Sequence, residues 1–277
     1  MDSLLLFTTL LSGFLAFAIP IGLAWKYCKK WDVSLKVAGL GAVFFVAVQV
    51  LHTPLVLLTQ SSVYSVFQSS LGATGAMLVL AIYLGLLAAV FEEVGRYLVF
   101  SRFLKEKGVK PAIIFGVGWG GVEAVIFLGI LATVNIFTLD AIFTTGVPQY
   151  VDGLVSSGQL PADQSQLVMD SLLAQKQQFD TMGPVLPFVG LWERIIAMAF
   201  HVCASVLVMI SILDGKMRGL YLALVAHFLL DFVAVASTLV TKDAVVLEAM
   251  LSVFVACVIV LTVREFKRAR LQEPVVF

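Results

Sequence analysis

Long apolar stretches separated by shorter polar connections dominate the hydrophobic pattern of this chain. A membrane-spanning helix needs about 20 largely apolar residues, because each residue adds about 1.5 Å across a hydrocarbon core about 30 Å thick. Seven stretches meet this requirement, and they run near 4–25, 37–59, 76–100, 111–137, 188–213, 219–240 and 244–263. The pattern predicts an all-α fold: a polytopic transmembrane helix bundle of about seven spans.

Composition supports the same class of protein. Hydrophobic residues make up 60% of the 277 residues, charged residues make up 13%, and mean hydropathy is +1.02. Too few polar side chains remain to cover a water-facing surface. The formal net charge is zero, which removes the electrostatic argument for a nucleic-acid partner. We therefore expect a multi-pass protein of the cell membrane whose surroundings are the lipid bilayer.

The distribution of Lys and Arg predicts how the chain is oriented. Alternate connections contain 14 of these residues, which lie within 26–36, 102–110, 216–218 and 264–270. The opposite connections contain only Lys176 and Lys242. Because Lys and Arg are enriched in cytoplasmic connections, we predict that the N-terminus lies outside the cell and that the C-terminus is cytoplasmic.

The chain is expected to form one membrane-embedded helical domain, 1–277, with one long connection. This connection, 138–187, is predicted to be external by the same charge rule. Within it, residues 162–180 combine three Leu with polar neighbours, a composition that predicts a short surface helix. The connection is either a solvated connector or a lid over the helix bundle.

Ionisable residues interrupt four of the predicted spans. A charged side chain at the centre of a span costs about 2.5–3.5 kcal/mol on insertion scales, so such residues usually face the bundle interior and mark function. The residues concerned are Glu92, Glu93, Arg96, Glu123, Glu193, Arg194, His201, His227 and Asp231. Most of them lie at a similar predicted depth, roughly 12–18 Å below the cytoplasmic face, whereas the pair Glu193 and Arg194 lies nearer the external end.

Helical spacing places several of these residues on common faces. Glu92 and Glu93 precede Arg96 by four and three residues, and acid before base at either spacing favours ion pairing on a helix, so Arg96 can neutralise one glutamate and leave the other to titrate. His227 and Asp231 are four residues apart, so the carboxylate can orient the imidazole. Near Glu123, glycines allow close approach between helices; they are Gly116, Gly118, Gly120 and Gly121. We interpret His52 as a core histidine, because it has no partner at a useful spacing.

Three classes of function fit this pattern. The first is an intramembrane endopeptidase, which needs a general base and a group that stabilises the oxyanion. Buried Glu, His and Asp could supply both, and the same groups could bind zinc. The second is an ion-coupled transporter, in which intramembrane acids and histidines relay ions. The third is a non-catalytic membrane scaffold or receptor. The familiar zincin, serine and aspartyl protease signatures are absent.

Two forms of the endopeptidase mechanism are open from the residues alone. In the metal-free form, Glu92 or Glu93 is the base, and His227 and His201 stabilise the oxyanion. In the metal form, zinc is the expected ion, and a glutamate of the pair remains the base. The candidate metal ligands are Glu123, His201, His227 and Asp231.

The order and spacing of these motifs resemble those of a known family. Glu92-Glu93-x-x-Arg96, Trp119-x3-Glu123, Glu193-Arg194 with His201, and His227-x3-Asp231 resemble the YhfC-type membrane proteins, over about residues 76–240. YhfC-type proteins are grouped with PrsW-like proteases and CAAX prenyl endopeptidases. The resemblance implies an intramembrane protease of glutamic or metallo type, acting on a membrane-anchored peptide or protein.

The resemblance also implies a role for each matching residue. Glu92 or Glu93 corresponds to the glutamate that activates water, and Arg96 to the basic residue that closes the motif. Glu123 matches the acid of the middle motif. The remaining matches are to histidine motifs, and they are His201, His227 and Asp231. Departures from the PrsW-like pattern bear on substrate specificity more than on chemistry; they are Arg96 for lysine, Trp119 for phenylalanine and Ala124 for asparagine.

Overall fold

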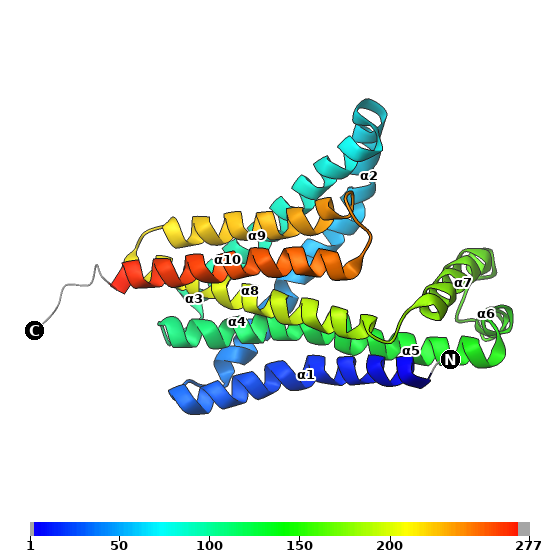
Figure 1. Ribbon diagram of the computed structural model, residues 1–277, viewed down its shortest axis with the longest axis horizontal. Coiled ribbons are helices and arrows are strands. Elements are labelled where there is room, and N and C mark those ends of the chain that lie inside the picture. Colours follow the sequence, from blue (N-terminus) through cyan, green and yellow to red (C-terminus); the bar gives the residue numbers. More distant parts are fainter. Residues whose placement is uncertain (1–2, 271–277) are drawn as a thin grey trace, which may run out of the picture. The chain divides into compact units, whose positions relative to one another are not determined.

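The computed structural model describes residues 3–270, and all of its regular elements are helical (Figure 1). This confirms the predicted all-α class. The elements are α1 (Ser3–Trp31), α2 (Lys36–Ala89), η1 (Val90–Val94), α3 (Gly95–Arg102), α4 (Val109–Ala124), η2 (Val125–Ile130), α5 (Leu131–Thr145), α6 (Val147–Ser156), η3 (Ala162–Gln164), α7 (Ser165–Thr181), α8 (Leu186–Asp214), α9 (Arg218–Ser237) and α10 (Ala244–Arg270).

Within residues 3–270, six helical elements are long and apolar enough to cross a membrane, one fewer than the predicted count of about seven. The difference arises because the predicted stretches 37–59 and 76–100 lie in one continuous element of 67 residues, Lys36–Arg102. If straight, it would be roughly 100 Å long, about three times the thickness of a hydrocarbon core. Its two arms meet at a kink.

The kink lies at Gly72, which has φ 70° and ψ 177°. Only glycine adopts this conformation readily, because any Cβ would clash with the backbone. The chain therefore reverses there, and α2 runs outward and back as a hairpin (Figure 1). Each arm carries one of the two predicted apolar stretches.

Two compact units can be distinguished along the chain. Unit 1 comprises Met1–Phe17 and Val125–Leu191, and unit 2 comprises Ala18–Ala124 and Trp192–Phe277. Unit 1 has its own apolar core, formed by Leu5, Leu139, Ile142, Val147, Val151, Leu172 and Phe179. In unit 1, α7 covers most of the 162–180 stretch for which a helix is predicted. Unit 2 contains every candidate site residue.

Glycine faces bring the helices of unit 2 close together. A Cβ added at Gly116 or Gly120 would lie 2.6 Å from the Cα atom of Val202 or Met198, respectively, both on α8. On another face of α4, a Cβ at Gly118 would collide with the backbone of Ala38. These contacts confirm the predicted close approach of helices, and they place α8 directly beside the helix that carries Glu123.

Candidate active site

The paired glutamates lie on a short π-helical turn, η1, between α2 and α3. π-turns inserted in α-helices are rare and frequently occur at functional sites. Both side chains are buried, with exposed fractions of 6% for Glu92 and 0% for Glu93. Two adjacent carboxylates are thus held inside the helix bundle, where each needs partners to offset the loss of water.

Glu93 is engaged by two cationic or hydrogen-bonding side chains. Arg96 Nη1 donates to Glu93 Oε1 at 2.6 Å and pairs with both carboxylate oxygens. His227 Nδ1 lies 2.6 Å from the same Oε1. Because a carboxylate paired with arginine is an acceptor only, Nδ1 carries the hydrogen in this bond. Glu93 therefore fixes the orientation of the His227 ring and directs its Nε2 atom away from Arg96.

Arg96 also connects this pair to α8. Its Nη2 donates to His201 Nδ1 at 3.0 Å, and its guanidinium lies 4.6 Å from the centre of the Trp119 ring. Because arginine can only donate, His201 Nδ1 must be the acceptor. The hydrogen of a neutral His201 is then on Nε2, which lies 2.7 Å from Glu123 Oε2. Both ring nitrogens of His201 are consequently used in the network.

Arg194 pairs with Glu193, as expected, and also binds Glu123. Its Nη1 donates to Glu123 Oε1 at 2.8 Å, and its Nη2 contacts Glu193. Glu123 is thus held from both sides, by Arg194 and by His201. Through Glu123, the Glu193–Arg194 pair is connected to His201.

Glu92 faces the two histidines. Its Oε2 accepts a hydrogen bond from Trp119 Nε1 at 3.0 Å and lies 3.9 Å from His201 Nδ1 and 4.0 Å from His227 Nε2. Its Oε1 accepts from Gln49 Nε2 at 2.9 Å. Glu92 is therefore held by two neutral donors and, unlike Glu93, makes no direct ion pair with Arg96 in the described network.

Asp231 completes the group at its less buried edge. Its Oδ2 lies 3.7 Å from His227 Nε2, as the spacing of four residues on α9 predicts, and its side chain is 32% exposed. The structure thus brings all the proposed catalytic residues into one connected group, which we call the Glu/His network; it consists of Glu92, Glu93, Arg96, Glu123, His201, His227 and Asp231.

Gln49 was missed by sequence reasoning, although it contacts Glu92. The available signal was a polar stripe in an apolar stretch: Gln49, His52 and Thr53 have the spacing of one helix face. In the structure, His52 Nδ1 and Thr53 Oγ1 lie 3.2 Å and 3.1 Å from Gln49 Oε1. The prediction that His52 lacks a partner at a useful spacing was wrong for this reason.

The donor chemistry of the network fits zinc, which binds imidazole nitrogen and carboxylate oxygen. His227 and Asp231 present such atoms to each other, and Glu93 orients His227 from its other nitrogen, as outer partners of metal-bound histidines do. Glu123 and His201 instead contact each other. Among residues 3–270, no three His, Cys, Asp or Glu side chains are arranged so that they could hold a metal ion.

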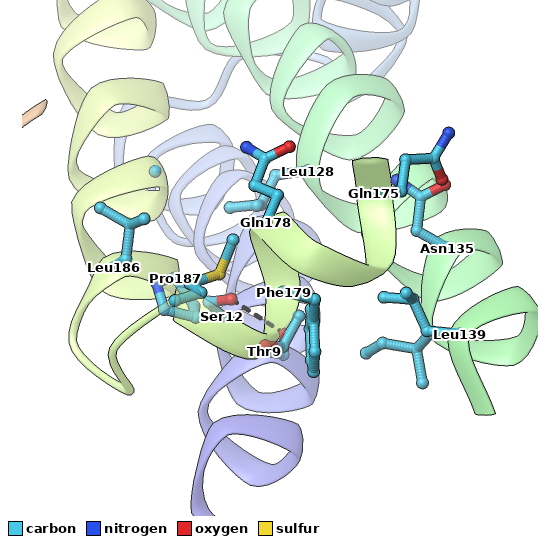
Figure 2. A pocket seen from close by; sticks show the side chains of 13 residues that line it. Thr9, Ser12, Leu128, Asn135, Leu139, Gln175, Gln178, Phe179, Leu186 and Pro187 are labelled. Carbon is cyan, nitrogen blue, oxygen red and sulfur yellow. Dashed lines mark hydrogen bonds between the residues drawn. The ribbon is translucent and has the colours of Figure 1, made fainter. Parts of the chain in front are cut away.

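A cavity of about 340 Å³ lies within unit 1, apart from these residues (Figure 2). Its lining residues are Thr9, Ser12, Leu128, Asn135, Ile136, Leu139, Gln175, Gln178, Phe179, Met182, Leu186, Pro187 and Gly190. None of these side chains is ionisable, so this lining offers no general base and no charged metal ligand. The candidate active site is therefore the Glu/His network of unit 2.

Comparison with known proteins identifies the family of this chain. Residues 15–255 match the family described as YhfC intramembrane metalloprotease. The chain is 29% identical over 264 residues to the uncharacterized membrane protein YhfC of Bacillus subtilis (strain 168), covering 94% of each chain. No solved structure matches. Since the family match covers most of the chain, including every residue of the Glu/His network, this protein belongs to the YhfC intramembrane metalloprotease family.

Proposed function

We propose that the protein is an intramembrane endopeptidase in which Glu92 activates the attacking water and His227 stabilises the transition state. The observation that carries this proposal is the position of Glu92 Oε2, which faces His227 Nε2 at 4.0 Å inside the bundle. A general base must reach the water that it deprotonates, and an electrophilic group must reach the developing oxyanion. The substrate is a membrane-associated peptide or protein.

Glu92 suits the role of base better than Glu93. Glu93 is bound by Arg96 and by His227, so its carboxylate oxygens already accept hydrogen bonds from those two side chains. Glu92 accepts one bond on each oxygen, from Gln49 and Trp119, and each carboxylate oxygen can accept two. Oε2 therefore keeps acceptor capacity on the side that faces His227.

His227 suits the role of electrophilic group better than His201. Glu93 binds its Nδ1 and so stabilises a positive charge on the ring, while Nε2 remains directed toward Glu92 and Asp231. His201 is held at both nitrogens, by Arg96 and Glu123. We therefore assign His201, Glu123 and Arg96 to positioning: they fix the rings and carboxylates around the reacting groups.

The family assignment implies a metal, and His227 with Asp231 are the residues that would hold it. A bound zinc ion supplies Lewis-acid polarisation of the scissile carbonyl. With zinc bound, His227 would act as a ligand and would no longer stabilise the oxyanion itself, whereas Glu92 would still take the proton of the water and Glu93 would still hold the ring of His227. Of the four ligands predicted from the sequence, His227 and Asp231 are the two whose donor atoms face each other, one fewer than the three protein ligands usual for a catalytic zinc.

The test uses membranes from cells that lack the protein, so that no substrate has to be chosen in advance. Purified wild type is incubated with these solubilised membranes, and new peptide N-termini are identified by mass spectrometry. We expect cleavage products with wild type that are absent with Glu92→Gln and His227→Ala. Glu265→Gln, which removes an acid of the pair with Arg218 outside the network, is the matched control. Equal products from wild type and Glu92→Gln would show that the proposed base is wrong.

The metal is tested separately by elemental analysis of purified protein. We expect zinc close to one ion per chain in wild type and in Glu265→Gln, with loss of zinc in His227→Ala and Asp231→Asn. Active wild-type protein that contains no metal would support the metal-free glutamate mechanism instead. The two experiments therefore separate the identity of the base from the need for zinc.

A further inference from the structure

We infer that Gln49 is a positioning residue that holds Glu92 against Trp119 and His227, an inference that rests on the proposed role of Glu92 as base. Gln49 Nε2 lies 2.9 Å from Glu92 Oε1. Gln49 is on the first arm of the α2 hairpin, and Glu92 follows the second arm, at nearly equal chain distances from Gly72. This hydrogen bond therefore connects the first arm of α2 to the Glu/His network.

The orientation of the Gln49 amide is determined by its neighbours. Its Oε1 lies 3.1 Å from the Thr53 hydroxyl and 3.2 Å from His52 Nδ1. Glu92 can only accept when ionised, so the amide must direct its N–H₂ group toward Glu92 and its oxygen toward Thr53 and His52. We call Gln49, His52 and Thr53 the α2 brace. Its members hold the amide in the one orientation that serves the carboxylate.

His52 also contacts the residue next to Glu92. Its ring lies 5.4 Å from the ring of Phe91, at an interplanar angle of 30°. Its Nε2 is buried and has no hydrogen-bond partner within the described part of the chain. With Nδ1 donating to Gln49 Oε1, Nε2 of the neutral ring carries no hydrogen and is an acceptor. The brace thus supports the π-turn through both the Phe91 ring and the Glu92 carboxylate.

Such support matters because a general base works only within narrow geometric limits. Carboxylates and rings at active sites need outer partners that hold them within about 0.5 Å. Glu92 lies on the π-turn η1, an irregular segment of the kind that is frequent at functional sites. Loss of comparable outer partners at metal sites typically costs 10–100-fold in activity or affinity, and we expect an effect of this size for Gln49.

The first test does not depend on activity. Trp119 donates to the same carboxylate, so its indole N–H resonance reports where Glu92 lies. In protein labelled with ¹⁵N-tryptophan, Trp119→Phe assigns this resonance among the four tryptophans. We expect Gln49→Leu and the isosteric Gln49→Glu to shift the resonance. An unchanged resonance in both variants would overturn the inference.

The matched control for this test is Thr59→Val. Thr59 forms another hydrogen bond between the two arms of α2, to the Tyr83 hydroxyl at 2.6 Å, away from the Glu/His network. We expect Thr59→Val to leave the Trp119 resonance in place. A shift of equal size in Thr59→Val would mean that any loosening of the hairpin moves the signal, and it would also overturn a specific role for Gln49.

The second test measures kinetics on a synthetic peptide that spans the strongest cleavage site found in the membrane experiment. We expect Gln49→Leu to lower kcat about 10–100-fold with KM within about two-fold, while Thr59→Val keeps the wild-type kcat. If Glu92→Gln is inactive and Gln49→Leu keeps full kcat, the inference fails and the proposed function stands. If Glu92→Gln cleaves like wild type, the proposed function fails, and a positioning role in catalysis fails with it.

Discussion

Arg96 shows how a single side chain organises the site. It is fully buried, and its guanidinium contacts Glu93, His201 and the Trp119 ring. Replacing it would leave Glu93 buried without its cationic partner, and breaking a buried ion pair in this way typically costs 3–5 kcal/mol. We expect Arg96→Met to lower the free energy of unfolding by about 3–5 kcal/mol, measured by thermal unfolding in detergent.

A double variant identifies the cause of that loss. Arg96→Met combined with Glu93→Gln removes both charges, so the protein should regain part of the stability that Arg96→Met loses. The measurement is a double-mutant cycle with both single variants. If the double variant is less stable than Arg96→Met alone, the buried charge of Glu93 is not the source of the effect.

Glu123 and Glu193 provide a matched pair, because both contact Arg194. The Glu123 side chain is 15% exposed and also binds His201, whereas the Glu193 side chain is 41% exposed. We expect Glu123→Ala to destabilise by about 3–5 kcal/mol and Glu193→Ala by at most about 1 kcal/mol. Equal losses in thermal unfolding would contradict the distinction between the two acids.

The charged residues of the site could be predicted from the sequence, whereas the neutral residue Gln49 could not. An acid or imidazole in an apolar stretch carries a large insertion cost, so Glu92, His201 and His227 stand out in the sequence. Gln49 carries no charge, and its partner Glu92 is on η1, beyond the second arm of α2. The tautomer of His201 also depends on Arg96, which lies 105 positions earlier in the chain. The Gln49–Glu92 hydrogen bond and the tautomer of His201 both depend on contacts between helices.

Among the elements, the contact of α4 with α8 depends on glycine. A Cβ at Gly120 would lie 2.6 Å from Met198 Cα and 3.2 Å from His201 Cδ2, so the helices would have to separate. We expect Gly120→Ala to destabilise by about 1–3 kcal/mol, as overpacked cores do. At Gly22, in α1, no atom lies within 4 Å of an added Cβ, so Gly22→Ala should be neutral or stabilising by about 0.5–1 kcal/mol.

Thermal unfolding of both glycine variants checks this prediction. The Gly22→Ala control matters because alanine favours helix at either position, so a loss in Gly120→Ala alone isolates the steric contact with α8. Equal stability of the two variants would show that α8 can move away from α4 without loss. Cleavage activity should fall in Gly120→Ala, since the added Cβ would displace the His201 ring.

Helix positions followed from the apolar pattern, but breaks in the helices, such as those at Gly72 and at η1, did not. The reversal at Gly72 depends on a positive φ angle, and a glycine in a helical stretch can instead continue the helix and pack against a neighbour, as Gly118 does. The π-turn at Val90–Val94 adds a residue to one helical turn, which leaves no mark on composition. Both breaks depend on packing between helices.

At the scale of the whole molecule, the zero net charge conceals two groups of charges with different roles. One group, the buried acids and bases of the Glu/His network, lies in unit 2. The other consists of the Lys and Arg residues of the connections, which predict the orientation in the membrane. The helical class was predictable because hydropathy alone determines it. The division into two units was not, since apolar residues face both lipid and protein.

The orientation leads to the final prediction, which labelling of single cysteines can test. With Cys28, Cys203 and Cys257 replaced by alanine, a membrane-impermeant maleimide reacts only with an introduced, accessible cysteine. Ser34, between α1 and α2, is exposed, and Ser165, at the start of α7, is partly exposed. Because Lys and Arg surround Ser34 and are scarce near Ser165, we expect Ser165→Cys to be labelled in intact cells and Ser34→Cys only after permeabilisation. The reverse labelling pattern would mean that the protein has the opposite orientation in the membrane, with the Glu/His network nearer the outer face than the charge distribution predicts.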